Sequence, residues 1–118
     1  MKGIENSLST EKYTKVLVDK SEIMYSAPHK FQVINNETKE VLANISFQNG
    51  AIKEHGINGV CNEDLIVMVL ERMYYFQNSL FNCKENEQAI INLEQALMWL
   101  RKRTMDRELR GVEGTHRI

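Results

Sequence analysis

The C-terminal half constrains the fold most, because its apolar residues recur at helical spacing over two long segments. The first segment begins at Asn62, a residue type that caps helix N-termini. Glu63 and Asp64 follow, where the positive end of a helix dipole favours acidic side chains. These signals predict a helix from Asn62 to about Gln77.

A second helix follows a break at residues 78–81. Asn82 and Glu85, three positions apart, resemble a capping box. The helix should reach about Arg110 and end at Gly111, since glycine readily adopts the left-handed conformation at a helix C-terminus. Two long helices joined by a short turn form an antiparallel hairpin.

The apolar residues of this hairpin exceed what one chain can cover. The first helix is apolar nearly all round, which predicts that it is buried nearly all round. The second helix carries a main stripe and an opposite stripe. The main stripe is Ala89, Leu93, Ala96, Leu97 and Leu100, and the opposite stripe is Ile91, Met98, Met105 and Leu109. We therefore expect a homo-oligomer, a dimer or a ring such as a hexamer.

The apolar pattern of residues from about 12 to 57 predicts a β region, because the apolar residues alternate or come in short β-branched runs. The alternation continues on both sides of the polar bend at 35–38, as in a β-hairpin. The predicted fold is thus α+β: a small N-terminal antiparallel sheet, then a long antiparallel helical hairpin at about 62–110. A glycine-containing tail, residues 111–118, completes a single domain of 118 residues.

Composition narrows the function. The formal net charge of -1 argues against a partner that is a polymeric nucleic acid. No run of about 18 apolar residues and no signal peptide occurs, so we expect a cytoplasmic protein without a membrane partner. Cys61 and Cys83 lack zinc-ligand spacing, and the histidines are isolated. No catalytic residue, metal or cofactor is predicted, although catalytic groups can converge in space without a motif.

Three arginines at the end of the second helix are the main functional signal. Arg103, Arg107 and Arg110 cluster within about 60° on a helical wheel, along or beside the main apolar stripe. Guanidinium groups on such a face need an anionic partner, either a ligand or a carboxylate of the protein. Gly114 and Thr115 allow a turn whose N–H groups and hydroxyl could hold phosphate oxygens. Pairing with carboxylates and with the helix dipole remains an equal alternative.

Aromatic residues near the hairpin turn could stack on a purine, although aromatic residues on an apolar helix more often belong to the core. They are Tyr74, Tyr75, Phe76 and Phe81, with Trp99 further along. At 1.5 Å per residue, about 25 Å separate Asn86 near the turn from Arg103. A small ligand that touches both must therefore lie between two chains that run antiparallel.

Several segments carry a resemblance to a known family. They are 44–50 (NISFQNG), 58–60 (NGV), 62–65 (NEDL), 97–104 (LMWLRKRT) and 110–116 (RGVEGTH). Together they resemble the phage Thoeris anti-defence sponge family, whose helical hairpin is shared with anti-CBASS cyclic-nucleotide sponges. The likeness covers roughly residues 40 to 116.

The resemblance implies a protein that sequesters a glycocyclic isomer of ADP-ribose, made by bacterial TIR enzymes, without cleaving it. It implies that Phe76 stacks on adenine, that Asn86 hydrogen-bonds the ligand, and that Arg103 and Arg107 hold its phosphates. The implied place of action is the cytoplasm of the infected host.

The resemblance also implies a second site for cyclic oligonucleotides such as cyclic trinucleotides, with Arg110, Gly114 and Thr115 as candidates. Ala51 and His55 depart from the family pattern and put the choice of ligand in doubt. Two alternatives remain: an enzyme that hydrolyses the same signal, and a structural or adaptor oligomer without a nucleotide ligand.

Overall fold

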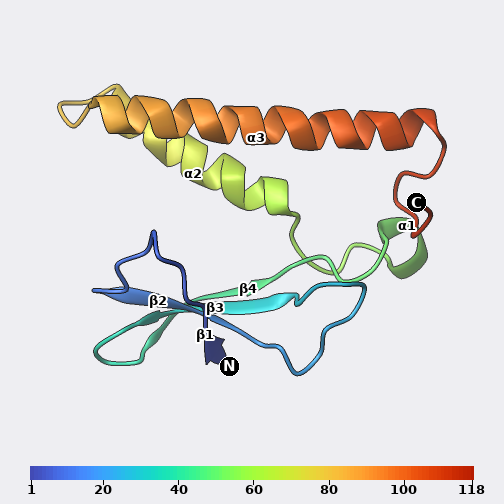
Figure 1. Cartoon of the computed structure of the whole chain (residues 1–118), viewed down its shortest axis with the longest axis horizontal. Coiled ribbons are helices and arrows are strands. Elements are labelled where there is room, and N and C mark those ends of the chain that lie inside the picture. The colour runs from blue at the N-terminus through green and yellow to red at the C-terminus, as the bar shows by residue number, and fades with distance from the viewer. The chain divides into compact units, whose positions relative to one another are not determined.

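The computed structural model describes residues 1–118, which form two compact units, Met1–Val60 and Cys61–Ile118. The first unit contains a β-sheet and one short helix, and the second is a pair of helices with a C-terminal tail (Figure 1). The α+β class is therefore confirmed.

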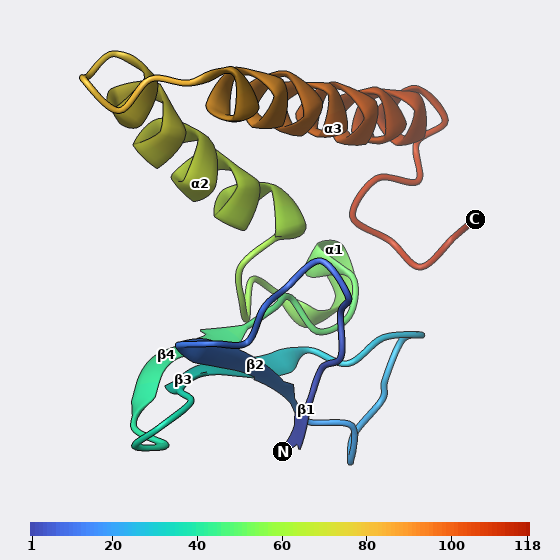
Figure 2. The ribbon, with the colours of Figure 1, turned by 60° about the vertical axis from the view of Figure 1, so that its left-hand side comes forward.

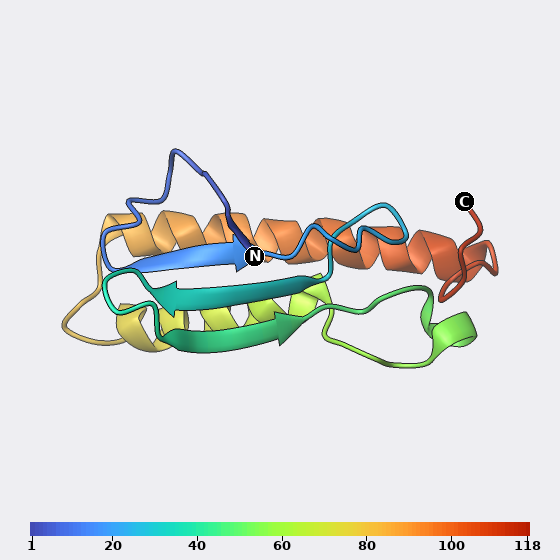
Figure 3. The same ribbon diagram turned by 90° about the horizontal axis from the view of Figure 1, so that it is seen from below.

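The sheet of the first unit has four antiparallel strands in the order β1-β2-β3-β4. The strands are β1 (Lys2–Gly3), β2 (Thr14–Val18), β3 (Lys30–Asn35) and β4 (Val41–Ser46). β2, β3 and β4 lie side by side (Figure 2 and Figure 3). β1 begins before the predicted β region of about 12–57, because a two-residue strand leaves no alternation to detect.

The predicted β-hairpin is formed by β3 and β4, and its bend is a local hydrogen-bonded turn. Asn35 Oδ1 accepts hydrogen bonds from the backbone N–H groups of Glu37 at 2.9 Å and Thr38 at 3.0 Å. Lys39 closes the turn with a φ of 65°. Such Asx turns explain why the polar bend identified the hairpin correctly.

The segment between β4 and the second unit is held by backbone and amide hydrogen bonds. Phe47 and Val60 form a parallel bridge at its two ends. Between them, Gln48 accepts a hydrogen bond from the Asn58 backbone N–H at 3.0 Å. The segment contains a short helix, α1 (Ile52–His55), that the β assignment of this region missed. Four residues are too few to establish a helical period.

The second unit is the predicted antiparallel hairpin, built from α2 (Asn62–Gln77) and α3 (Lys84–Leu109). The two helices meet at residues 78–83 (Figure 1). The longest element, α3, has 26 residues and would measure about 39 Å at 1.5 Å per residue. Neither helix is apolar enough and long enough to be a candidate for spanning a membrane.

The helix caps differ from those expected. Cys61, not Asn62, is the N-cap of α2, and its backbone N–H donates to Asp64 Oδ2 at 2.8 Å. Cys83, not Asn82, is the N-cap of α3, and its Sγ accepts from the Asn86 backbone N–H at 3.4 Å, while the Asn82 amide donates to the Ser79 carbonyl at 2.8 Å within the turn. Each cap therefore lies one residue away from the asparagine that the sequence suggested.

The predicted stop at Gly111 is confirmed. Gly111 has a φ of 72°, in the left-handed region. Its N–H donates to the Glu108 carbonyl at 3.1 Å, and the Val112 N–H donates to the Arg107 carbonyl at 3.0 Å. This pair of bonds is the Schellman pattern, and buried Val112 anchors the start of the tail.

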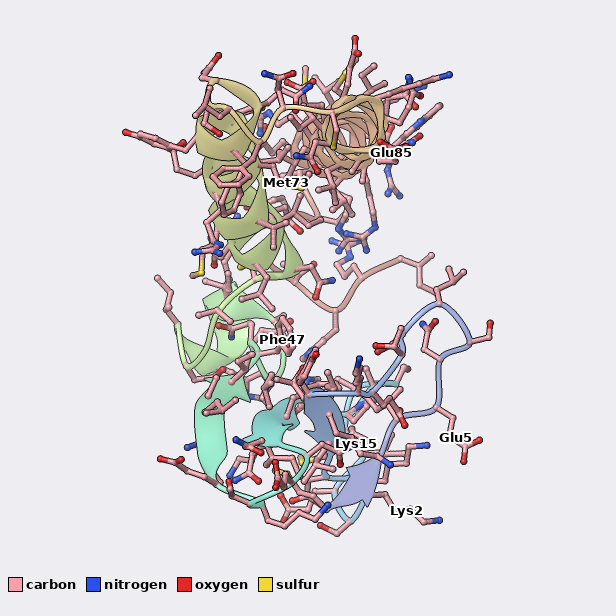
Figure 4. All side chains as sticks on the ribbon, turned by 90° about the vertical axis from the view of Figure 1, so that its left-hand side faces the viewer. Lys2, Glu5, Lys15, Phe47, Met73 and Glu85 are labelled. Carbon is pink, nitrogen blue, oxygen red and sulfur yellow. The ribbon has the colours of Figure 1, made fainter.

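The prediction that α2 is buried nearly all round is wrong for the single chain. Leu70 is its one fully buried residue, and Tyr75 is 73% exposed. The less exposed apolar residues follow one stripe at helical spacing. One of them, half-buried Met73, is labelled in Figure 4. A two-helix unit can cover only one face of each helix, so the remaining apolar residues stay exposed.

The two stripes predicted on α3 are distinct in the structure. The main stripe is half-buried, and half-buried Arg107 extends it toward the C-terminus. The opposite stripe is exposed, with exposed fractions of 39% for Ile91, 70% for Met98 and 48% for Met105. The single chain therefore leaves uncovered the surface that the sequence predicted to need a partner.

Candidate functional site

The C-terminal end of α3 places the three predicted arginines in unlike surroundings. Arg107 is half-buried, whereas Arg103 and Arg110 are exposed. Their partners also differ, and these partners decide which guanidinium groups can receive an anion.

Arg107 holds the tail by its Nη2 atom. This nitrogen donates to the carbonyl oxygens of Val112 at 3.0 Å, Thr115 at 3.0 Å and Arg117 at 2.9 Å. Three acceptors share two hydrogens, so the guanidinium is firmly oriented. Carbonyl groups do not neutralise its charge, and Arg107 forms no ion pair with a carboxylate.

This arrangement limits how Arg107 can bind phosphate. A guanidinium offers two-donor edges, Nε with Nη2 and Nη1 with Nη2. Because Nη2 belongs to both edges and already binds carbonyl groups, only Nε and Nη1 remain for a ligand while the tail is in place. Each can donate singly, and the fixed orientation lowers the entropy cost of doing so.

Arg110 pairs with a carboxylate, which is the alternative to ligand binding that the sequence pattern left open. Its Nε donates to Asp106 Oδ2 at 3.1 Å, and its Nη1 donates to the Ile118 carbonyl at 2.8 Å. Arg103 contrasts with it, because the Arg103 guanidinium has no hydrogen-bond or ion-pair partner within the chain. Arg103 is thus the more available of the two for an anion.

The predicted Gly114–Thr115 cradle is a turn closed on itself. Gly114 adopts a φ of 72°. The Thr115 hydroxyl donates to the Val112 carbonyl at 2.6 Å, and the Thr115 N–H donates to the same carbonyl at 3.2 Å. Both Thr115 donors are therefore engaged within the tail, and an anion would have to displace the Val112 carbonyl to reach them.

Phe76 and Asn86 lie near the opposite end of α3, at the hairpin turn. Phe76 is 41% exposed, and the guanidinium carbon of Arg72 lies 5.4 Å from the centroid of its ring. Asn86 is half-buried, and its amide nitrogen makes a long contact of 3.4 Å with the Phe81 carbonyl. Phe76 thus offers an open surface for stacking, and Asn86 has hydrogen-bonding capacity to spare.

The turn itself is braced by one side chain. Gln77 donates from Nε2 to the Cys83 carbonyl at 3.0 Å and accepts from the Cys83 N–H at 3.2 Å. This pair of bonds ties the end of α2 to the start of α3. Phe76 and Asn86 are therefore carried on elements whose connection is fixed.

The structure does not bring these two groups of residues together within one chain. α3 runs unbroken from the turn to the arginines (Figure 1), and about 25 Å lie between Asn86 and Arg103 along it. A small ligand therefore cannot contact both groups of residues within one chain.

Sequence reasoning missed Arg72 as a member of the turn end. The signal was present, because residues four apart on a helix share a face and Arg72 precedes Phe76 by one turn. Arg72 is the one basic residue of α2, among many apolar residues.

Two open hollows lie over the exposed stripe of α3. One, of about 610 Å³, is lined by Leu97, Met98, Arg101, Lys102, Met105, Asp106 and Leu109. The other, of about 470 Å³, is lined by Gln95, Met98, Trp99 and Lys102. The Lys102 ammonium lies 5.0 Å from the Trp99 ring centroid. Both hollows suit the side chains of a partner surface more than an enclosed ligand.

The fold is that of an α+β protein whose helical hairpin carries an exposed aromatic residue, Phe76, near its turn and arginines at its other end. Residues 39–105 match the family described as "Acb2/Tad1, hairpin domain", and the chain belongs to this family. The matched range includes Phe76, Asn86 and Arg103.

One curated relative is similar over nearly its whole length. It is "Thoeris anti-defense 1" of Bacillus phage SBSphiJ7, 45% identical over 140 residues, with 98% of this chain and 99% of the relative covered. The family and this relative together support a role in phage anti-defence.

Proposed function

We propose that this protein binds and sequesters glycocyclic ADP-ribose, a nucleotide signal of bacterial Thoeris immunity, in the host cytoplasm. The observation that carries the proposal is half-buried Arg107, a fixed cation that has no carboxylate partner. A cation so placed favours an anionic ligand, and a pyrophosphate supplies one. Arg103 adds a second charge one turn away.

The ligand lies between two chains in this proposal. The turn end of one chain contributes Phe76 for stacking and Asn86 for hydrogen bonding, and the other chain contributes Arg103 and Arg107. Only an antiparallel arrangement of the two α3 helices brings these ends together. Two equivalent sites then form per pair of chains, or one signal molecule per chain.

The surface of α3 supports this arrangement. The exposed stripe of Ile91, Met98 and Met105 follows seven-residue spacing, which suits helix pairing. The charges also favour antiparallel packing. The first half of α3 carries Glu85, Glu87 and Glu94, and the second half carries Arg101, Lys102 and Arg103. Antiparallel helices place these opposite charges against each other.

Sequestration requires binding without turnover. A protein made in excess over the signal lowers the free signal concentration by mass action. The proposed contacts are stacking, hydrogen bonding and charge, and none of them breaks a bond. A second ligand, a cyclic oligonucleotide at Arg110, Gly114 and Thr115, would extend the role to CBASS immunity. The internal contacts of Thr115 make this the weaker part of the proposal.

The decisive experiment incubates the protein with glycocyclic ADP-ribose, measures binding by calorimetry, then denatures the protein by heat and analyses the released nucleotide. Binding followed by release of intact ligand is expected. A linear product would establish the hydrolase alternative. No binding of this ligand or of cyclic trinucleotides would contradict the proposal and favour the adaptor alternative.

The two-chain pocket has its own test. Phe76→Ala chains and Arg103→Ala chains should each bind poorly alone, but mixing them should restore a fraction of intact sites, since each lacks a different half. Subunit exchange is confirmed with differently tagged chains by native mass spectrometry. If exchanged oligomers bind no better than the parents, the two halves do not meet between chains.

A further inference from the structure

We propose that Arg72 is a third ligand-binding cation, contributed from the aromatic half of the site that the proposed function places around Phe76. Its guanidinium carbon lies 5.4 Å from the Phe76 ring centroid, and both residues belong to α2. The proposal adds an anion contact at the end of the hairpin that has so far supplied only stacking and an amide.

The partners of the hairpin arginines single out Arg72. Arg101 lies 3.5 Å from Glu108, Arg110 is paired with Asp106, and Arg107 is bound to the tail. Arg72 and Arg103 alone among the arginines of α2 and α3 have guanidinium groups without a hydrogen-bond or ion-pair partner. Arg72 therefore retains all of its N–H donors for a ligand, whereas Arg107 does not.

The contact with Phe76 orients Arg72 without consuming those donors. A guanidinium group above an aromatic ring is attracted by the ring electrons and remains charged. It shields one face of the ring, and Phe76 as a residue is still 41% exposed. A purine can stack on the open surface of the ring, and the proposal requires its phosphates to reach past the ring edge to the guanidinium of Arg72.

The consequence for the two-chain site is a cation on each side of the ligand. Arg103 and Arg107 of one chain approach the phosphates from the arginine end of α3. Arg72 of the other chain approaches them from the aromatic surface. Such a clamp would favour a nucleotide with a pyrophosphate over a nucleoside, since a nucleoside has no charge for Arg72 to contact.

The test compares Arg72→Ala, Arg72→Gln and Arg72→Lys in the full-length protein, by calorimetry with glycocyclic ADP-ribose and with adenosine. Arg72→Ala and Arg72→Gln should each weaken binding of glycocyclic ADP-ribose by about tenfold. Arg72→Lys should lose less, since it keeps the charge. All three should bind adenosine within about twofold of the wild type, and the salt dependence of nucleotide affinity should fall in the two uncharged variants.

Lys84→Ala is the matched control, because it removes another exposed cation close to the turn, one that does not contact the Phe76 ring. It should leave both affinities unchanged. Equal losses for adenosine and the nucleotide would overturn the proposal, because Arg72 would then act only by orienting the ring. A wild-type affinity in Arg72→Ala would also overturn it. If the wild-type protein itself binds no nucleotide, the proposed function fails first, and the role of Arg72 fails with it.

Discussion

The arginine end and the turn end of the hairpin hold their functional side chains in different ways. At the arginine end, Arg107 is fixed by three carbonyl groups of the tail, so its position depends on the fold of residues 112–118. At the turn end, Phe76 is partly exposed, and its ring makes a cation–π contact with the flexible side chain of Arg72. The first is preorganised for charge, and the second can adapt to the shape of a base.

In the proposed site, this difference gives the two ends separate tasks. A fixed cation contributes affinity for any phosphate in reach, whereas an adaptable aromatic surface contributes selectivity for the base. In the proposed site neither end is sufficient alone, because about 25 Å of helix separates them within a chain. The surface that joins two chains should therefore matter more than either end.

The largest effect is expected from Met98→Glu, which places a charge in the middle of the exposed stripe of α3. Met98 is 70% exposed in the single chain, so the substitution leaves the folded unit intact while it opposes burial between chains. Light scattering should show monomers. Affinity for glycocyclic ADP-ribose should fall by at least about a hundredfold, because both ends lose their partner.

Gln88→Glu makes the matching control, since it adds the same charge at another exposed position of α3. It should keep both the oligomer and the affinity. A monomeric Met98→Glu protein with wild-type affinity would show that one chain binds the ligand unaided. The claim that the two ends bind the ligand only together, from two chains, would then be wrong.

Arg107→Lys should have the next largest effect and should act on the arginine end alone. Lysine keeps the positive charge, but its compact ammonium cannot reproduce the spread of three carbonyl contacts. We expect affinity to fall by about tenfold or more and hydrogen exchange to accelerate across residues 112–118. Arg103→Lys, at a guanidinium without a partner in the chain, should leave tail exchange unchanged. Unchanged exchange in Arg107→Lys would remove the claim that this arginine is preorganised by the tail.

The sequence predicted the elements better than it predicted the contacts of the site. Helix bounds near Gln77 and Gly111 were foreseen because apolar periodicity and glycine are local signals. The hydrogen bonds from Arg107 to the tail were not foreseen, because they depend on residues that fold back after the helix has ended. The same limit applies to the caps, where Cys61 and Cys83 took positions assigned to asparagine.

The arginine pattern shows how far a helical wheel can go. It placed Arg107 on the half-buried stripe correctly, but it treated Arg103, Arg107 and Arg110 as one group. Their partners separate them: no partner for Arg103, carbonyls for Arg107, and Asp106 for Arg110. A helical wheel gives the direction of a side chain, but it does not predict which residues from other parts of the chain will contact that side chain.

The smallest effect is expected from Tyr74→Phe, at the contact that joins the two helices between their ends. The Tyr74 hydroxyl donates to Glu94 Oε2 at 2.8 Å, and this bond is the main cause that raises the pKa of Tyr74 above its ordinary value of 10.0. Because the folded pKa exceeds the unfolded one, the stabilisation is fully present below about pH 10 and is lost as the pH rises through the folded pKa.

Thermal unfolding of the wild type and Tyr74→Phe should therefore differ slightly at neutral pH, with the wild type more stable. The difference should shrink in alkaline solution, where the wild-type tyrosine ionises beside a carboxylate. Ligand affinity should stay near the wild-type value, because the two ends are held by their own contacts, Arg107 to the tail and Gln77 to Cys83. A large loss of affinity in Tyr74→Phe would mean that the angle between the helices positions both ends. The two ends would then be coupled to each other and not held independently.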